Sequence, residues 1–506
     1  MSDRQAPVIV GVAQVRRREK LDGPCEPMEP TKMMMEAVNR AAEDAGNPDI
    51  GAEADYVGTV PTMSWGYEDA TKHLSGLLGA SPTTLHEPVA GGSSPLNLLH
   101  HAAAAISQGK VKVAVIAGAE SLQSRQQAAR NKIRLDDWGV LADPPIDTLQ
   151  RGQDPMTSPL EMRHGLFLPA DVFALYESAQ RAHCGRSIEE HQAYLAKLMA
   201  GFSEVAAQNP VAWFPEARSA EDFSTISASN RWINFPYPKL MNSIIMVDMA
   251  AAFIVMSAEE ADRRNIPKEQ QVAFLGGASS TDPWTLSERV QFHSSPGCTA
   301  AAQAALDAAA IGVADIDLFD LYSCFPSAVQ FGLDALGLTA DDPRPKTVTG
   351  GLACAGGPGN NYCTHSVAAM VERLRAGDGK IGYVSGLGMA AAKHTVSIFS
   401  TDPERIAAAS GETPAVTRQC ESDSAPEMVD APEGGGTIET YIVAFDRNNN
   451  PEVSRMIIRL NDGRRTVACG EATPAAFAKL LENEGVGLHG RIIPDTDKQT
   501  NTFILD

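Results

Sequence analysis

EPVAGGSSPLNLLHHAAAAISQGKVKVAVIAGAES, residues 87–121, is the most informative stretch of this chain. A glycine pair leads into an alanine-rich segment typical of a helix, and a glycine stop is followed by an apolar segment typical of a buried strand. Residues 350–391, GGLACAGGPGNNYCTHSVAAMVERLRAGDGKIGYVSGLGMAA, repeat that order. The spacing is 27 positions from Gly91 to Gly118 and 30 from Gly356 to Gly386. Two such units predict an α/β fold with duplicated halves.

Further motifs in the same order carry a resemblance to the thiolase superfamily. They are MVDMAAAFIVMSAEEA (246–261), DLFDLYSCFPSAVQ (317–330), TVTGGLACAGGPG (347–359) and VSGLGMAAA (384–392). With residues 87–121 they are similar to the SCP2-type (sterol carrier protein) thiolases and thiolase-like proteins over roughly positions 7–400.

The resemblance implies a five-layered αβαβα core with a loop domain over the active site. We expect the N-terminal half at residues 1–255, with the loop domain at about 121–240, and the C-terminal half at 256–400. In the family, the loop domain carries most of the coenzyme A contacts. Basic residues there are candidates for phosphate contacts or for solvated surface charges: Arg151, Arg163, Arg181, Arg186 and Arg231.

Four side chains carry the family's chemistry, and the resemblance assigns a position to each. The nucleophilic cysteine corresponds to Gly92, and the histidine that activates it corresponds to Gly357. The acid/base cysteine corresponds to Val384, and the first residue of the motif that supplies an oxyanion-hole side chain corresponds to Tyr322. Neither glycine nor valine can titrate or attack, and Claisen chemistry needs both a thiolate and a base. We therefore expect no ordinary thiolase turnover.

Backbone donors survive such substitutions. In thiolases, one oxyanion hole is built from N–H groups that correspond to those of Gly92 and Gly386. A glycine at a helix N-terminus leaves room for a carbonyl oxygen near the positive end of the helix dipole. The resemblance thus implies a pocket for a thioester carbonyl without a nucleophile.

Two residues are candidates for replacement chemistry. Tyr322 stands where steroid side-chain-cleaving aldolases of this superfamily carry a tyrosine in a Tyr-Asp-x-Phe motif, although Ser323 replaces the aspartate here. His365 lies just downstream of the glycine cluster and is a candidate general base. The alternatives are a buried tyrosine and a structural histidine, both ordinary in protein cores.

Cysteine usage indicates neither a metal site nor disulfides. The eight cysteines are spread over the chain without a C-x-x-C pair. Cys324, Cys354 and Cys363 lie in or beside the motifs, and we interpret them as small hydrophobic residues rather than as substitute nucleophiles. Reduced thiols predict a cytoplasmic protein.

Charge and hydropathy restrict the partners. The formal net charge of −21 opposes nucleic-acid binding, which needs a basic surface. No secretory signal precedes the first motif, and the longest apolar run, Ile244 to Met256, contains Asp248 and is too short to span a bilayer. We expect no membrane insertion.

The resemblance to the thiolase core ends near residue 400. Residues 401–430 are rich in proline, serine and acids and are typical of a linker. Residues 431–506 predict three strands, a helix and two strands, with turn signals at Asn448–Asn450 and at Asp462–Gly463. That order suggests a small OB-fold-like β-barrel. It lacks dense basic and aromatic residues, so an oligonucleotide ligand is not expected.

The sequence leaves three functions open. The first is binding of CoA or acyl-CoA in lipid metabolism without turnover. The second is catalysis of an acyl transfer or a retro-aldol cleavage with replaced residues, and the third is a role as a scaffold for a partner enzyme. No cofactor is expected besides CoA or acyl-CoA as a ligand. The fold family makes a homodimer possible, and a monomer is not excluded.

Overall fold

The computed structural model describes residues 5–23, 25–142, 156–408 and 425–506. Part of the expected loop domain (143–155, with Arg151) and part of the expected linker (409–424, with Cys420) lie outside these described residues.

One nine-stranded mixed sheet forms the core, in the order β3-β2-β4-β7-β1-β8-β11-β10-β9. The first half of the chain supplies β1 (Pro7–Arg16), β2 (Tyr56–Thr59), β3 (Thr84–His86), β4 (Val113–Ser121) and β7 (Asp248–Ser257). The second half supplies β8 (Val272–Thr281), β9 (Leu318–Asp320), β10 (Ile381–Gly388) and β11 (Lys393–Ser400). The halves join where β1 pairs with β8, at Val8↔Ala273 and Ile9↔Val272.

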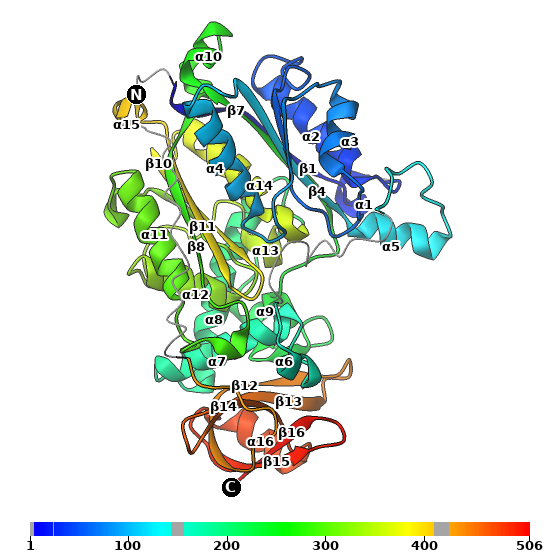
Figure 1. The fold of residues 1–506 in the computed structure, drawn as a ribbon, viewed down its shortest axis with the longest axis vertical. Coiled ribbons are helices and arrows are strands. Elements are labelled where there is room, and N and C mark those ends of the chain that lie inside the picture. The colour runs from blue at the N-terminus through cyan, green and yellow to red at the C-terminus, as the bar shows by residue number, and fades with distance from the viewer. Residues whose placement is uncertain (1–4, 24, 143–155, 409–424) are drawn as a thin grey trace.

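Helices cover both faces of each half. In Figure 1, α4 (Ser94–Ser107) and α14 (Tyr362–Arg375) lie in the centre, between the strands of the two halves. Each contacts strands of both halves. The outer helices are α2 (Pro30–Asp44) and α3 (Ala70–Leu78) on the first half and α11 (Pro296–Ala308) and α12 (Pro326–Ala335) on the second. The predicted duplicated α/β core is confirmed.

Small residues allow this close layering. All ten residues of β7 are buried, as expected for a strand covered by helices on both faces. A β-carbon added at Gly11 of β1 would overlap the carbonyl oxygen of Ala41 in α2. Glycine therefore lets this helix lie directly on the strand.

A loop region lies between β4 and β7. It contains α5 (Leu122–Asn131), α6 (Pro159–Arg163), α7 (Pro169–His183), α8 (Ile188–Gln208) and α9 (Ala220–Ser224), followed by β5 (Trp232–Phe235), β6 (Tyr237–Pro238) and the 3-10 turn η2 (Lys239–Met241). Capping boxes at Ser158, Ser187 and Ser219 begin α6, α8 and α9, so serine three residues before an acid defines these helix starts.

The C-terminal region forms a small barrel with the predicted element order. Its elements are β12 (Gly434–Phe445), β13 (Pro451–Leu460), β14 (Arg465–Gly470), α16 (Pro474–Glu482), β15 (His489–Asp495) and β16 (Thr500–Leu505). The strand order is β13-β14-β16-β15-β12, and β12 pairs again with β13 to close the barrel. The predicted β-barrel is confirmed, with a helix between its third and fourth strands as in an OB-fold.

The barrel is joined to the loop region by strand pairing as well as by the chain itself. β12 pairs with β5 at Val443↔Phe235 and Ala444↔Asn234, so the two regions share a sheet. The barrel also contacts the C-terminal half of the core, where the fully buried Arg465 donates to the carbonyl oxygen of Ser287 at 2.8 Å. Figure 1 shows the barrel below the loop region.

Two of the arginines considered for phosphates serve this boundary instead. The fully buried Arg181 donates to Tyr441 Oη at 3.1 Å and to Glu484 Oε1 at 2.8 Å. Arg163 pairs with Asp430 at 3.0 Å. No helix in the described part of the chain is long and apolar enough to cross a bilayer.

Candidate functional site

Gly92 lies in the turn that begins α4. The space that a side chain at this position would occupy is filled by neighbouring atoms. A β-carbon added there would overlap the phenol oxygen of Tyr322 and the carbonyl oxygen of Leu387. Gly92 is not among the glycines with positive φ, so its own backbone conformation would accept another residue. The tyrosine from the second half of the chain therefore occupies the space that a cysteine would need.

Tyr322 follows β9 and is held from several sides. Its backbone N–H donates to Ser385 Oγ at 3.0 Å, and its ring meets that of Tyr362 edge-on, with 5.6 Å between the centroids. Only 7% of the residue is exposed. No hydrogen bond among the described residues involves its hydroxyl group. Burial raises the pKa of this phenol well above its usual value, so the hydroxyl group stays protonated and is not available as a base.

Gly357 corresponds to the histidine of the family, and the space for a side chain at this position is also occupied by a neighbour. A β-carbon added at Gly357 would overlap Ser243 Oγ, which comes from the end of the loop region. The Gly357 N–H donates to the carbonyl oxygen of Ile244 at 2.8 Å. A side chain at 357 would therefore have to displace this serine.

Val384 and Gly386 lie two residues apart on β10 and face the central helices. Val384 is fully buried, between Asp320 of β9 and Ser397 of β11 in the sheet, and belongs to the hydrophobic core. A β-carbon at Gly386 would lie 3.0 Å from the Cα of Ser93 and 3.1 Å from Cys363 Sγ. Glycine at 386 thus lets the start of α4 approach β10.

The structure brings Gly92, Gly386 and Tyr322 together, and it places His365 elsewhere. His365 Nδ1 lies 3.0 Å from Gln14 Oε1 of β1. Two residues along a helix correspond to about 200° of rotation, so His365 points away from the side on which Cys363 meets Gly386. Burial lowers the pKa of His365 to about 3, which makes it a weak base.

The three cysteines near the motifs are buried thiols. Burial raises the pKa of Cys354 to about 12 and also raises those of Cys324 and Cys363 well above the usual value of a thiol. The thiolate is the nucleophilic form, so none of them is activated as a substitute. The described residues contain no group of three or more His, Cys, Asp or Glu side chains that could hold a metal ion.

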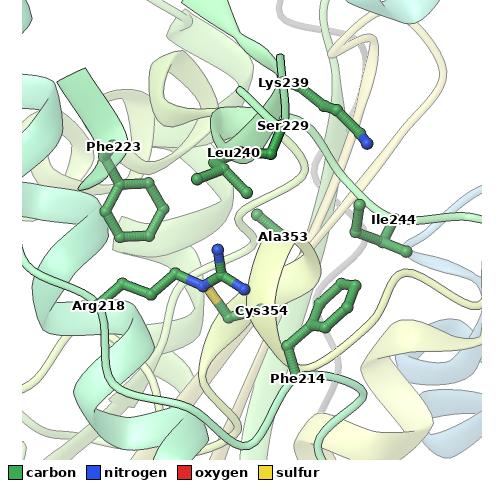
Figure 2. A pocket seen from close by; sticks show the side chains of 9 residues that line it. All are labelled: Phe214, Arg218, Phe223, Ser229, Lys239, Leu240, Ile244, Ala353 and Cys354. Atoms are coloured by element: carbon green, nitrogen blue, oxygen red, sulfur yellow. The ribbon is translucent and has the colours of Figure 1, made fainter. Parts of the chain in front are cut away.

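A cavity of about 200 Å³ opens in the loop region beside α13 (Gly351–Cys354). Figure 2 shows the Arg218 guanidinium extending between the rings of Phe223 and Phe214. The lining is mostly apolar, with two cations: Phe214, Arg218, Phe223, Ser229, Lys239, Leu240, Ile244, Ala353 and Cys354. Arg218 also lies over the Phe214 ring, 5.8 Å from its centroid. Apolar walls with a few polar groups are typical of ligand pockets.

Ile244 connects this cavity with the central site. It lines the cavity, its N–H donates to the Leu352 carbonyl oxygen at 3.1 Å, and its carbonyl oxygen accepts from the Gly357 N–H. The inner wall of the cavity therefore contacts the turn that carries the histidine in the family.

Sequence reasoning did not find Arg218 or Lys239. Arg186 lies over Tyr194, and Arg231 donates to the Trp232 carbonyl oxygen, so these two arginines also have partners in the fold. The signal for Arg218 was its place in the aromatic-bearing stretch NPVAWFPEARSAEDF, residues 209–223.

Comparisons with known proteins bear on the whole chain. The family described as "Thiolase-like protein type 1 additional C-terminal domain" matches residues 415–497. The crystal structure of a monomeric SCP2-thiolase like protein type 1 from Mycobacterium smegmatis is 31% identical, with 100% of both chains covered and a TM-score of 0.81. This chain belongs to the thiolase superfamily, as an SCP2-thiolase-like protein of type 1. No curated protein matches it.

Two more distant solved structures share the fold of the core. The Ltp2-ChsH2(DUF35) aldolase is 19% identical, with 79% of this chain and 99% of that chain covered and a TM-score of 0.60. Human mitochondrial 3-ketoacyl-CoA thiolase in complex with CoA is 17% identical, with 79% and 99% covered and a TM-score of 0.57.

Proposed function

We propose that this protein binds CoA or acyl-CoA as a cytoplasmic component of lipid metabolism and does not catalyse the thiolase reaction. The observation that carries the proposal is the filled reaction centre. Tyr322 Oη occupies the space of a side chain at 92, and Ser243 Oγ occupies that of a side chain at 357. Neither a nucleophile nor its base has room, and both are needed to hold an acyl group and form a carbanion.

The loop-region cavity supports the binding part of the proposal. Phe214, Phe223 and Leu240 offer apolar contacts to a pantetheine arm, and Arg218 and Lys239 offer cations to phosphate groups. The cavity is smaller than the roughly 300–1,000 Å³ of typical ligand pockets, so we propose that it receives part of CoA and leaves the nucleotide at the surface. The fold is also that of a thiolase solved with CoA.

Calorimetry and an activity assay test this proposal together. We expect CoA to bind the wild-type protein measurably, while acetoacetyl-CoA thiolysis stays far below the roughly 1–1000 per second of ordinary enzymes. Ala353→Trp places a large ring in the cavity and should abolish CoA binding. Thiolysis at ordinary rates would refute the loss of activity, and unchanged binding by Ala353→Trp would place CoA elsewhere.

Retro-aldol cleavage is a second candidate, favoured by the position of Tyr322. When the Cα–Cβ bond of a β-hydroxyacyl thioester breaks, the β-hydroxyl loses its proton to water and becomes a carbonyl, and the thioester is left as an enolate. The protonated phenol stands beside Gly92, where it would donate its proton to the α-carbon of that enolate and then be reprotonated by water. Tyr322→Phe removes only the hydroxyl and should abolish cleavage with folding and CoA binding intact. The absence of cleavage by the wild-type protein, also with candidate partner proteins, would leave binding or a scaffold role.

We further propose that the protein is a monomer, because its 31% identical relative from Mycobacterium smegmatis is described as monomeric. This favours the monomer over the homodimer that the fold family allows. Light scattering should give the mass of one chain at micromolar concentration, and a dimer mass would contradict the proposal.

A further inference from the structure

The outer wall of the cavity is organised by one buried amide. Asn230, 1% exposed, donates from Nδ2 to the carbonyl oxygens of Asp222, Phe223 and Thr225 at 3.0–3.1 Å. Its Oδ1 accepts from the Leu240 N–H at 2.9 Å. Phe223 and Leu240 both line the cavity, so this side chain sets their separation.

The C-terminal barrel holds the segment that carries Asn230. Asn449 Oδ1, from the turn between β12 and β13, accepts from the Trp232 N–H at 2.9 Å. The Trp232 ring stacks on Phe445 of β12, with 5.9 Å between the centroids. The pairing of β12 with β5 extends this contact between the barrel and the segment that follows Trp232. Trp232 is two residues from Asn230, so the barrel restrains the wall directly.

The acceptor on the barrel is held in place before it meets the wall. Asn449 has φ +67°, a left-handed conformation that asparagine tolerates better than most residues. Asp446 Oδ1 accepts from the N–H groups of Asn448 and Asn450, both at 2.8 Å, and so braces the turn on either side. The Asn449 side chain therefore presents a fixed oxygen to Trp232.

The wall is built from short elements. It consists of the five-residue helix α9, an irregular stretch, the four-residue strand β5, the two-residue strand β6 and the three-residue turn η2. Such a segment relies on contacts with its neighbours to hold one conformation. When only a fraction of molecules has the competent conformation, the apparent affinity for a ligand falls by that fraction.

We infer that the barrel sets the affinity of the cavity for CoA, with Asn449, Trp232 and Asn230 as positioning residues that do not touch the ligand. The inference rests on the proposed binding of CoA in this cavity. It gives the additional C-terminal domain a role: to keep the loop-region wall in the conformation that receives the ligand.

Variants of the full chain at position 449 test the inference. Asn449→Gly removes the acceptor, and glycine tolerates the positive φ. Asn449→Asp keeps an acceptor oxygen at the same place and serves as the rescuing variant. Gln499→Gly is the matched control, because Gln499 also has a positive φ of 54° but sits in the β15–β16 turn of the barrel.

The first readout is the CoA dissociation constant, measured well below the melting temperature of each variant. We expect Asn449→Gly to weaken binding by about twofold to tenfold, the effect of one net hydrogen bond. Asn449→Asp and Gln499→Gly should bind as the wild type does. Equal affinities for all four proteins would overturn the inference and leave the proposed function standing. Failure of the wild-type protein to bind CoA would overturn both.

The second readout is hydrogen exchange of residues 230–241 with and without CoA. Because coupling is reciprocal, CoA should slow exchange in this segment in the wild type and in Asn449→Asp. Asn449→Gly should exchange faster without CoA and should need more CoA to reach the same protection. Faster exchange with unchanged affinity would show a merely structural contact and would overturn the inference.

Discussion

The central site and the loop-region cavity differ in how closely they are packed. At the central site, the space at Gly92 is taken by Tyr322 and the space at Gly357 by Ser243. In the loop region, a cavity of about 200 Å³ stays open, with Arg218 and Lys239 in its lining. Packing therefore fills the space beside Gly92 and Gly357 and leaves the candidate ligand cavity open.

The largest effect is a loss of stability, and it is expected when a side chain is placed at position 92. Gly92→Cys forces a side chain onto Tyr322 Oη and the Leu387 carbonyl oxygen. Overpacking of this kind costs typically about 1–3 kcal/mol, and we expect at least the upper end because a backbone atom cannot move aside easily. Urea unfolding measures the loss, and thiolysis should not appear since position 357 offers no base.

A matched glycine serves as the control. Gly76, inside α3, has nothing within 4 Å of an added β-carbon, so Gly76→Ala should be neutral or stabilising. Adding Tyr322→Ala to Gly92→Cys should recover part of the stability, because the overlap with Leu387 remains. Gly92→Cys with wild-type stability would show that the site is looser than its contacts indicate.

A smaller effect is expected at the open cavity. Arg218→Ala combined with Lys239→Ala removes both cations and should weaken CoA binding by about a hundredfold or more, since hydrogen bonds to charged groups are worth about 1.5–3 kcal/mol each. The affinity of this double variant for CoA should also depend less on salt concentration than that of the wild type. Titration calorimetry at two salt concentrations measures both. Lys72→Ala, at an exposed lysine on α3, is the control and should bind normally.

The smallest effect concerns the boundary between the loop region and the barrel. Asp171 of α7 accepts from Asn234 Nδ2 and lies 3.7 Å from Arg455. Burial raises the pKa of Asp171 from 3.8 to about 6, against the opposing charge of Arg455. Because the folded pKa is above the unfolded one, this group stabilises the fold below about pH 4, and that contribution is lost as the pH rises through 6.

Asp171→Asn should remove this part of the pH dependence. Between pH 4 and 7, the free energy of unfolding of the wild type should fall relative to that of the variant by about 2 kcal/mol. Asp497→Asn, at an exposed barrel carboxylate, should leave the profile unchanged. Parallel profiles for the wild type and Asp171→Asn would contradict the raised pKa.

Local patterns predicted the fold well and the site only in part. The order of elements after residue 430 could be predicted because Asp462–Gly463 and the residues around Asn449 mark turns within a few positions of the strands they join. The barrel's attachment to β5 could not, since Phe235 and Val443 are about two hundred positions apart and nothing local marks the pair. Arg181 was considered for phosphates on charge alone, and its buried partners are on the barrel.

The amino-acid sequence alone shows that positions 92, 357 and 384 carry no titratable side chain, because the identity of a residue fixes its chemistry wherever it lies. It also shows the duplicated halves, because helix and strand periodicities are local. Whether the space beside these positions is open was decided by packing between distant segments, which brings Tyr322 to Gly92 and Ser243 to Gly357. Close packing in a protein interior depends on shape in three dimensions, and shape at one residue is set by neighbours that the order of the chain does not reveal.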